Sequence, residues 1–328
     1  MPSFRRLAFA VALLLGVVAH APRADAQQQA QGFALERMYL SAPGGGWFVM
    51  DTLDLHGGLG GAVSLNLDYE RDSLRVRDDS HRLDAVSNQS LADIGFAITY
   101  RRWRLYLNLD IPIAITGQSG TIDGYTFTAP KENFSDTPDT LMDPRIGLDV
   151  RIFGGPKSRF RFGMGAQLFV PNYKRSDYVT DGTFRGMVRA LFAGDIGRFT
   201  YAAQLGAHIR PVDDPSVPGG PKGSELLFGA AVGVRMPLAH VKDWDVVLGP
   251  EVFGASAFNS FFAANGTALE ALLSARFEGT REDKMQVRVK VGAGAGLSQH
   301  FGAPEWRLTL AVEMFNRMVW PRLVPSTR

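Results

Sequence analysis

Residues 103–113, WRLYLNLDIPI, alternate between apolar and polar side chains over eleven positions. Apolar residues occupy every odd position, and Arg104, Tyr106, Asn108 and Asp110 stand between them. Successive side chains of a β-strand point to opposite faces, so the pattern predicts a strand with one apolar and one polar face. Strands of soluble proteins usually have about 5–6 residues, whereas about 9–11 residues of a tilted strand cross a bilayer. The length of this alternation favours an apolar face that meets lipid.

The same alternation recurs along most of the chain, and no apolar stripe with a helical period interrupts it. An α/β fold is therefore disfavoured. The predicted strands lie at 33–41, 46–56, 60–70, 89–100, 103–115, 143–153, 158–170, 182–194, 198–210, 224–237, 243–255, 267–279, 284–296 and 304–315.

The connections between these strands alternate between short and long from the third strand on. The long connections are 71–88, 116–142, 171–181, 211–223, 256–266 and 297–303. Short periplasmic turns and longer extracellular loops are typical of an outer-membrane barrel, which also has an even number of strands. We therefore predict an all-β fold, a transmembrane antiparallel β-barrel of about fourteen strands. The alternative has about twelve strands, in which residues 33–41 form an interior plug and 46–56 leave the wall with them.

The polar face of the predicted strands is rich in ionisable side chains. Such a set would be costly in a dry core, but it suits a wet or salt-bridged lumen. The pore-lining candidates are Arg104, Asp110, Arg145, Asp149, Arg151, Arg159, Arg161, Arg185, Arg189, Glu225, Glu251, Glu270, Arg288 and Lys290. Six of these arginines, between 145 and 189, fall on three successive strands and should form one patch, either as an anion-favouring constriction or paired with acids across the lumen.

The first residues predict export. Arg5 and Arg6 precede an apolar run that ends before Ala24-Asp25-Ala26, so we expect a signal peptide over 1–26 and the barrel over 27–328. The chain has no cysteine, which excludes disulfides and thiolate chemistry, and its net charge of +2 does not point to nucleic acid. The histidines lack the spacing of a metal site.

Several phrases resemble a known group of proteins. DPRIGLDVRIFGG, RFRFGMGAQLFVPNYKRSDYVTDG, LFAGDIGRFTYAAQLGAHIRP and GSELLFGAAVGVRM are similar to the barrel portion of outer-membrane proteins of the OmpA family. They also resemble, more loosely, outer-membrane transporters named after phenol-degradation operons. The resemblance spans about residues 33–315 and implies a barrel fold and an outer-membrane location.

Together these features predict a non-enzymatic pore or transporter for small solutes in the bacterial outer membrane, with no cofactor and no metal. Its expected partners are outer-membrane lipid, the barrel-assembly machinery and the small solutes themselves. The alternative is a structural or surface-interaction barrel whose lumen is closed by ion pairs.

Overall fold

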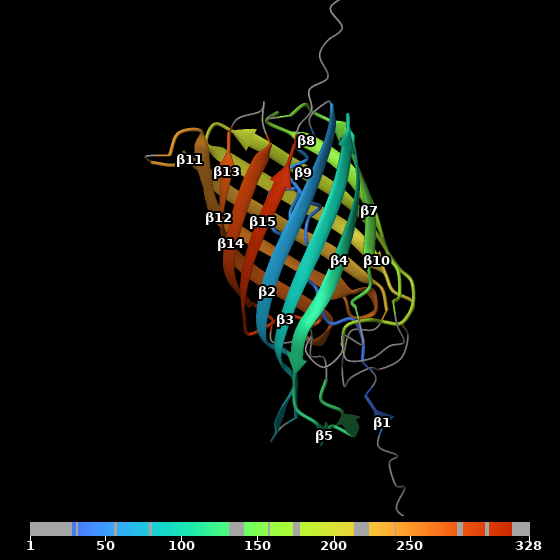
Figure 1. The fold of residues 1–328 in the computed structure, drawn as a ribbon. Coiled ribbons are helices and arrows are strands. Elements are labelled where there is room, and N and C mark those ends of the chain that lie inside the picture. Colours follow the sequence, from blue (N-terminus) through green and yellow to red (C-terminus); the bar gives the residue numbers. More distant parts are fainter. Residues whose placement is uncertain are drawn as a thin grey trace, which may run out of the picture.

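Twelve antiparallel strands close a single barrel in the computed structural model (Figure 1). The structure describes residues 28–30, 32–55, 58–78, 81–130, 141–156, 158–172, 178–212, 223–239, 241–280, 285–298 and 302–316. The order around the barrel follows the chain, and β15 pairs with β2 to close the wall. The predicted all-β barrel is confirmed, while the predicted signal peptide at 1–26 lies outside the described residues.

The wall consists of β2 (Leu59–Arg77), β3 (Arg82–Tyr100), β4 (Trp103–Thr116), β7 (Arg145–Phe153), β8 (Arg161–Phe169), β9 (Arg185–Ile196), β10 (Phe199–Ile209), β11 (Glu225–Pro237), β12 (Trp244–Ala257), β13 (Thr267–Gly279), β14 (Gln286–Gly296) and β15 (Trp306–Phe315). A second, small sheet contains β1 (Gln28–Gln29), β5 (Gly120–Ile122) and β6 (Tyr125–Phe127). In the described part of the chain the helices are two short 3-10 turns, Phe258–Ser260 and Ala264–Gly266, and neither is long or apolar enough to span a membrane.

The outer surface of the wall is apolar. Burial in β15 alternates at every residue: Trp306, Leu308 and Leu310 are exposed, and Arg307 and Thr309 face inward. The strand that contains residues 103–113 follows the same rule up to Asn108, so its apolar side faces out. Apolar side chains exposed all around a closed wall are covered by lipid rather than by another layer of protein.

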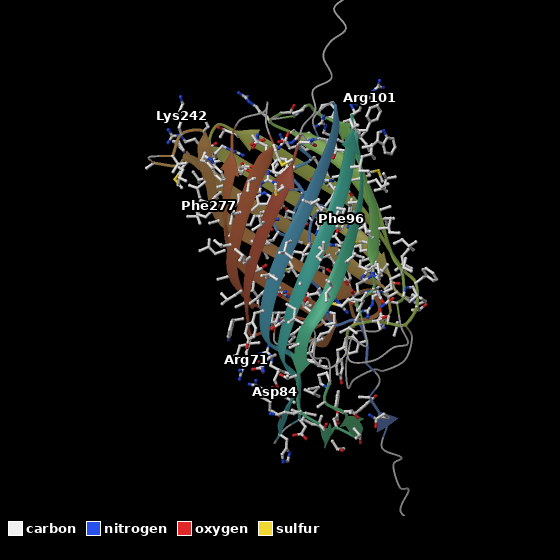
Figure 2. All side chains as sticks on the ribbon, viewed as in Figure 1. Arg71, Asp84, Phe96, Arg101, Lys242 and Phe277 are labelled. Atoms are coloured by element: carbon white, nitrogen blue, oxygen red, sulfur yellow. The ribbon has the colours of Figure 1, made fainter. Side chains whose placement is uncertain are left out.

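The barrel has two different ends. At the short-turn end, tight connections such as 101–102 and 197–198 join the strands, and at the loop end the longer connections lie. Figure 2 shows Arg101 and Lys242 at the short-turn end and Arg71 and Asp84 toward the loop end. The predicted asymmetry of the connections is therefore confirmed.

One of the predicted long loops is wrong. Residues 71–77 and 82–88 continue β2 and β3 as a paired hairpin, with register shifts on either side of Leu74 and regular pairing from Arg75–Asp84 to Arg77–Arg82. Leu74 and Val86 are fully buried in a cluster with Ile122 and Phe127 of the small sheet. β2 and β3 continue beyond the predicted end of the wall because their loop-end residues pack against apolar residues of the small sheet.

The main prediction of fourteen strands is also wrong, and the twelve-strand alternative is confirmed. Residues 33–41 and 46–56 were expected to form wall strands, but among the described residues 33–55 none is paired with the wall. We call residues 33–55 the lumen segment. Adjacent residues of a strand point oppositely, so a wall strand containing Glu36 and Arg37 would turn one charge toward lipid, which costs about 2–4 kcal/mol at the membrane midplane.

Candidate pore and the segment that fills it

The lumen segment crosses the barrel interior from the loop end to the short-turn end (Figure 1). It begins after β1, which pairs with β6 beyond the loop end, and it ends before β2 at the short-turn end. All of its residues are buried except Glu36, Leu40, Gly44 and Asp54, which are half-buried. The lumen segment is therefore enclosed by the barrel along its whole length, although it forms no β-pairing with the wall strands.

A tight loop forms the middle of the lumen segment. The amide of Ser41 donates to the Phe48 carbonyl, and the amide of Thr52 donates to the Gly45 carbonyl. Both hydrogen bonds are 2.7 Å long. Gly46 has a φ of 105°, and a Cβ there would lie 2.5 Å from Cγ2 of Thr52 and 2.9 Å from Nη1 of Arg276. Glycine suits this position because other residues rarely adopt such a φ and because neighbouring side chains leave no room for a Cβ.

Cationic side chains of the wall bind the carbonyls of the lumen segment. Buried carbonyl groups without partners are costly, and an irregular segment cannot satisfy them internally. The donors and acceptors are Arg145 Nη1 to the Leu40 carbonyl (2.8 Å), Lys290 Nζ to Trp47 (3.2 Å), Arg161 Nε to Thr52 (2.8 Å) and Arg151 Nη1 to Leu53 (3.0 Å).

Glu251 of β12 supplies the corresponding acceptor. Its Oε1 accepts from the Phe48 amide at 3.0 Å, and its Oε2 accepts from the Val49 amide at 3.0 Å and the Met50 amide at 3.5 Å. The Ser274 hydroxyl donates to the same carboxylate at 3.1 Å. Glu251 therefore fixes the tip of the loop from the opposite side of the lumen.

Apolar residues of the same loop pack against inward-facing apolar residues of the wall. Trp47, Phe48, Val49 and Met50 are at most 2% exposed. Their partners are Leu53 of the segment and Leu191, Ala193, Ala202, Ala231, Val247, Phe253, Leu272 and Ala311 of the wall. The lumen thus contains an apolar core as well as the predicted charges.

Ion pairs join the segment to the wall on either side of this core. Arg104 Nη2 donates to the carboxylates of Asp51 and Asp149, the latter at 2.9 Å, and Arg189 reaches Asp149 at 3.2 Å. Glu225 accepts from Arg37 of the segment at 2.8 Å. All of these side chains are buried, so their attraction is screened far less than on a surface.

Asp181, in the connection between β8 and β9, holds the loop-end part of the lumen segment. Its carboxylate accepts from the Ala34 amide at 2.8 Å and from two nitrogens of Arg210, each at 2.8 Å. Burial opposes ionisation of this carboxyl, but the Arg210 guanidinium outweighs it and holds the pKa of Asp181 well below its usual range. Asp181 therefore carries its charge throughout the physiological pH range.

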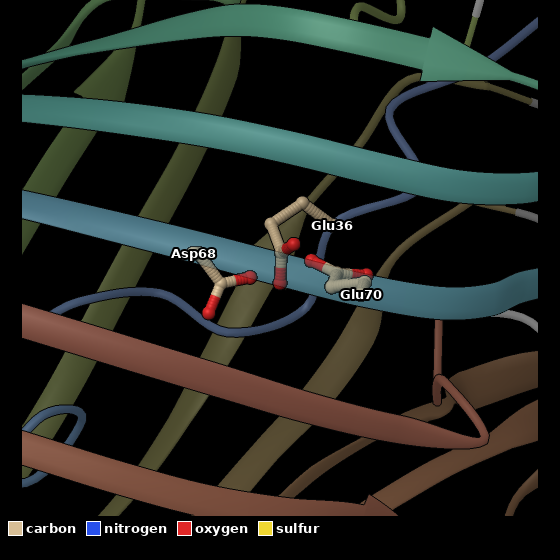
Figure 3. A group of neighbouring side chains, drawn as sticks. All are labelled: Glu36, Asp68 and Glu70. Atoms are coloured by element: carbon tan, nitrogen blue, oxygen red, sulfur yellow. The ribbon is translucent and has the colours of Figure 1, made fainter.

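Three carboxylates, Glu36, Asp68 and Glu70, lie close enough to share one cation (Figure 3). Arg307 already lies among them, 3.1 Å from Glu36, 2.6 Å from Asp68 and 2.8 Å from Glu70. Glu270 lies 3.0 Å from the same guanidinium. This group binds the segment to β2, β13 and β15, and the Arg307 guanidinium supplies positive charge at its centre.

The structure places every predicted pore-lining residue except Arg159 in the interior. The predicted arginine patch exists, because β7, β8 and β9 are neighbours. The remaining contacts are Arg185 to Asp143 (2.8 Å), Arg288 to Glu278 and Glu313 (2.8 Å each), Glu270 to Arg307, and Asp110 opposite Asp93 in register. Arg159 is exposed at the short-turn end.

Sequence reasoning missed the partners of these residues. The arginines were expected either to form an anion-favouring constriction or to pair with acids across the lumen. Arg161, Arg185 and Arg189 do pair with acids. The contacts that Arg145, Arg151 and Arg161 make with backbone carbonyls of the lumen segment were not expected. Two features of the sequence could have indicated a segment inside the lumen. One is the pair of adjacent charges at Glu36 and Arg37, and the other is the set of apolar residues at inward positions, such as Val247, Phe253 and Leu272. Apolar side chains facing a lumen indicate that something packs there.

Two interior cavities lie on either side of the loop of the lumen segment. A small one of about 50 Å³ on the loop-end side is bounded by Asp93, Asp110, Met142 and Phe169. A larger one of about 510 Å³ opens at the short-turn end and is bounded by Arg159, Arg161, Arg276 and Thr280, among others. Residues of the lumen segment border both cavities: Met38 and Leu40 the smaller one, and Thr52 and Asp54 the larger one.

No protein-family model matches this chain, and no curated protein sequence matches it. Among solved structures, it is similar to the COG4313 outer membrane channel from Pseudomonas putida F1, with 13% identity, 80% of this chain and 96% of that chain covered, and a TM-score of 0.50. The NanC porin (7% identity, 78% and 100% covered, TM-score 0.45) and the CymD monoaromatic hydrocarbon channel (9%, 82% and 90%, 0.39) are more distant. At this identity, the likeness to the first channel shows the fold of an outer-membrane β-barrel.

Proposed function

We propose that this chain is an outer-membrane pore for small solutes whose lumen segment acts as a resident plug. The observation that carries the proposal is a continuous non-strand segment, 33–55, that runs the length of the lumen and is attached to the wall strands through side-chain contacts. An eight-stranded barrel can be filled by its wall side chains alone, whereas a twelve-stranded one has additional interior space. Here that space is filled by a separate segment, which can be displaced without opening the wall.

The kind of attachment supports displacement. Side-chain hydrogen bonds, ion pairs and apolar packing hold the lumen segment, and no described residue of it pairs with a wall strand, so its release breaks no hydrogen bond between wall strands. These contacts exchange for contacts with water when the segment leaves. The barrel can therefore persist with the segment in or out.

The charges that line the lumen determine which ions the open pore prefers. The lumen segment contains one arginine, Arg37, and three acids, Glu36, Asp51 and Asp54, for a net charge of −2. When the lumen segment leaves the barrel, its net charge of −2 is removed from the lumen. The wall cations that bind its carbonyls then lose these partners. Fixed charges that line a constriction select ions of opposite sign, so we expect the open pore to favour anions.

Solute uptake into proteoliposomes tests the proposal. Swelling rates in an isotonic small sugar should be low for the full chain and several-fold higher for a deletion of residues 28–55, provided that the deleted form shows β-rich circular dichroism and heat-modifiable migration. A folded deletion variant that swells no faster than empty liposomes would instead identify a closed structural barrel.

Two finer points belong to the same proposal. We infer that the chain is exported by a signal peptide over 1–26 and inserted by the barrel-assembly machinery, which its exposed apolar wall requires. The resemblance to OmpA-family barrels stays a prediction.

A further inference from the structure

The cavity at the short-turn end has the composition of an anion-binding site. It occupies about 510 Å³ between the lumen segment and the turns, within the size range of small-molecule sites. Its charged boundary consists of five cationic side chains, Arg159, Arg161, Arg235, Arg276 and Arg288, and four acids, Asp54, Asp195, Asp245 and Glu278. The cations exceed the acids by one.

Arg276 of β13 is the buried cation with the weakest pairing in this cavity. It is 3% exposed, and its guanidinium lies 4.8 Å from the ring centroid of Trp47. Its Nε and Nη1 atoms have no hydrogen-bond partner among the described residues, and its Nε lies 3.6 Å from the Glu278 carboxylate. A buried guanidinium with unused donors is costly unless another acceptor reaches it.

Glu278 cannot neutralise Arg276, because two other arginines hold it more closely. Arg235 lies 2.6 Å and Arg288 2.8 Å from the Glu278 carboxylate. Arg235 also pairs with Asp245 at 3.3 Å and Arg288 with Glu313 at 2.8 Å. Among these three guanidiniums, Arg276 therefore lacks a second carboxylate of its own in the described part of the chain.

A second buried polar group faces the same cavity without a partner. Thr200 of β10 is 1% exposed, and its hydroxyl has no hydrogen-bond partner among the described residues. It lies three strands along the wall from Arg276, so the two groups define two separate contact points. The Phe315 ring supplies apolar surface at the cavity edge.

We propose that this cavity binds a small organic carboxylate, with Arg276 as the anion-binding residue. A planar carboxylate matches the fork of a guanidinium better than a spherical ion does. Thr200 provides a hydrogen bond for a second polar group, and Phe315 contacts the carbon skeleton. The inference names the solute class of the proposed pore, and in that sense it rests on the proposed function.

Trp47 gives a direct readout, because the arginine that binds the anion also stacks on its ring. Butyrate titrated into the full chain in detergent, at constant ionic strength, should change the tryptophan emission saturably, with a Kd on the order of millimolar for so small a ligand. Butyramide, which has the same size and no charge, should leave the emission unchanged. Trp47→Phe should remove the optical signal, while calorimetry still detects binding.

Variants assign the effect to Arg276. Arg276→Gln should weaken butyrate binding by at least about tenfold, as expected for the loss of a hydrogen-bonded charge pair. Arg276→Lys, which keeps the charge and loses the fork, should weaken it less. Arg75→Gln at the loop end, where the side chain is half-buried and donates to the Ala303 carbonyl, is the matched control and should bind as the wild type does.

The outcomes separate this inference from the proposed function. Equal responses to butyrate and butyramide, or wild-type affinity in folded Arg276→Gln, would overturn the carboxylate site even in a conducting barrel. Binding needs no conduction, so a barrel that binds butyrate and admits no solute would refute the pore and retain the site. If Arg276→Gln does not fold, the comparison of butyrate with butyramide on the wild type still shows whether the cavity binds a carboxylate.

Discussion

The carboxylate of Glu251 should set how often the lumen segment leaves the barrel. It accepts the amides of Phe48 and Val49 at 3.0 Å each, and it is fully buried. Glu251→Gln keeps the shape of the side chain but replaces one acceptor oxygen with an NH₂ donor, which then faces an amide donor. The change removes one charge-assisted hydrogen bond, at about 1.5–3 kcal/mol, and leaves a buried donor unsatisfied, at about 1–3 kcal/mol.

Taking about 3 kcal/mol as the combined cost, the population of the displaced segment should rise on the order of 100-fold. The chain has no native cysteine, so a single Val49→Cys reports on exposure of the loop, because Val49 is 2% exposed in the closed barrel. Maleimide labelling of this cysteine should accelerate on the order of 100-fold when Glu251→Gln is added.

The matched control is Glu305→Gln, at an exposed position at the loop end, which should leave the labelling rate of Val49→Cys unchanged. If Glu251→Gln and Glu305→Gln label at the same rate, Glu251 does not hold the segment and the account of its attachment is wrong.

Three further changes test other parts of the structure. Asp149→Asn leaves buried Arg189 without its acid partner and Arg104 with Asp51 alone, and should lower the free energy of unfolding by about 3–5 kcal/mol in urea titrations, whereas the exposed Asp123→Asn should have almost no effect. Arg159→Glu adds a negative charge at the mouth of the short-turn cavity and should shift the reversal potential in a salt gradient toward cations; an unchanged potential would place the ion path elsewhere. Leu74→Ala removes a fully buried side chain from the loop-end cluster at a cost of about 2–5 kcal/mol, so limited proteolysis should cut the β2–β3 hairpin faster while the wall stays intact.

The wall of the barrel could be predicted from the sequence because each strand separates two very different environments. The alternation at 103–113 is imposed by lipid on one side and charge on the other, and a slip of one residue would exchange them. The candidate pore residues were identified for the same reason: Arg145, Glu251 and Lys290 occupy positions opposite to the apolar ones. Local pattern was sufficient for these features.

The lumen segment could not be predicted in this way because no periodic environment surrounds it. Trp47, Phe48, Val49 and Met50 are four consecutive apolar residues that all pack in one buried cluster, whereas a wall strand would alternate apolar and polar residues. Its hydrogen bonds reach residues up to 271 positions away, as from Arg307 to Glu36, so no local signal specifies them. The carboxylate site at Arg276 was missed for a related reason, since its incomplete pairing depends on how Arg235 and Arg288 share Glu278.

Single-channel recording in a planar bilayer with a salt gradient can show whether the lumen segment closes the pore, when the full chain and the deletion of residues 28–55 are compared side by side. We expect brief, small openings for the full chain, and steady steps of several-fold larger conductance with an anion-biased reversal potential for the deletion. Equal conductance of the two forms, or no current from a folded deletion variant, would contradict a pore that its own lumen segment closes.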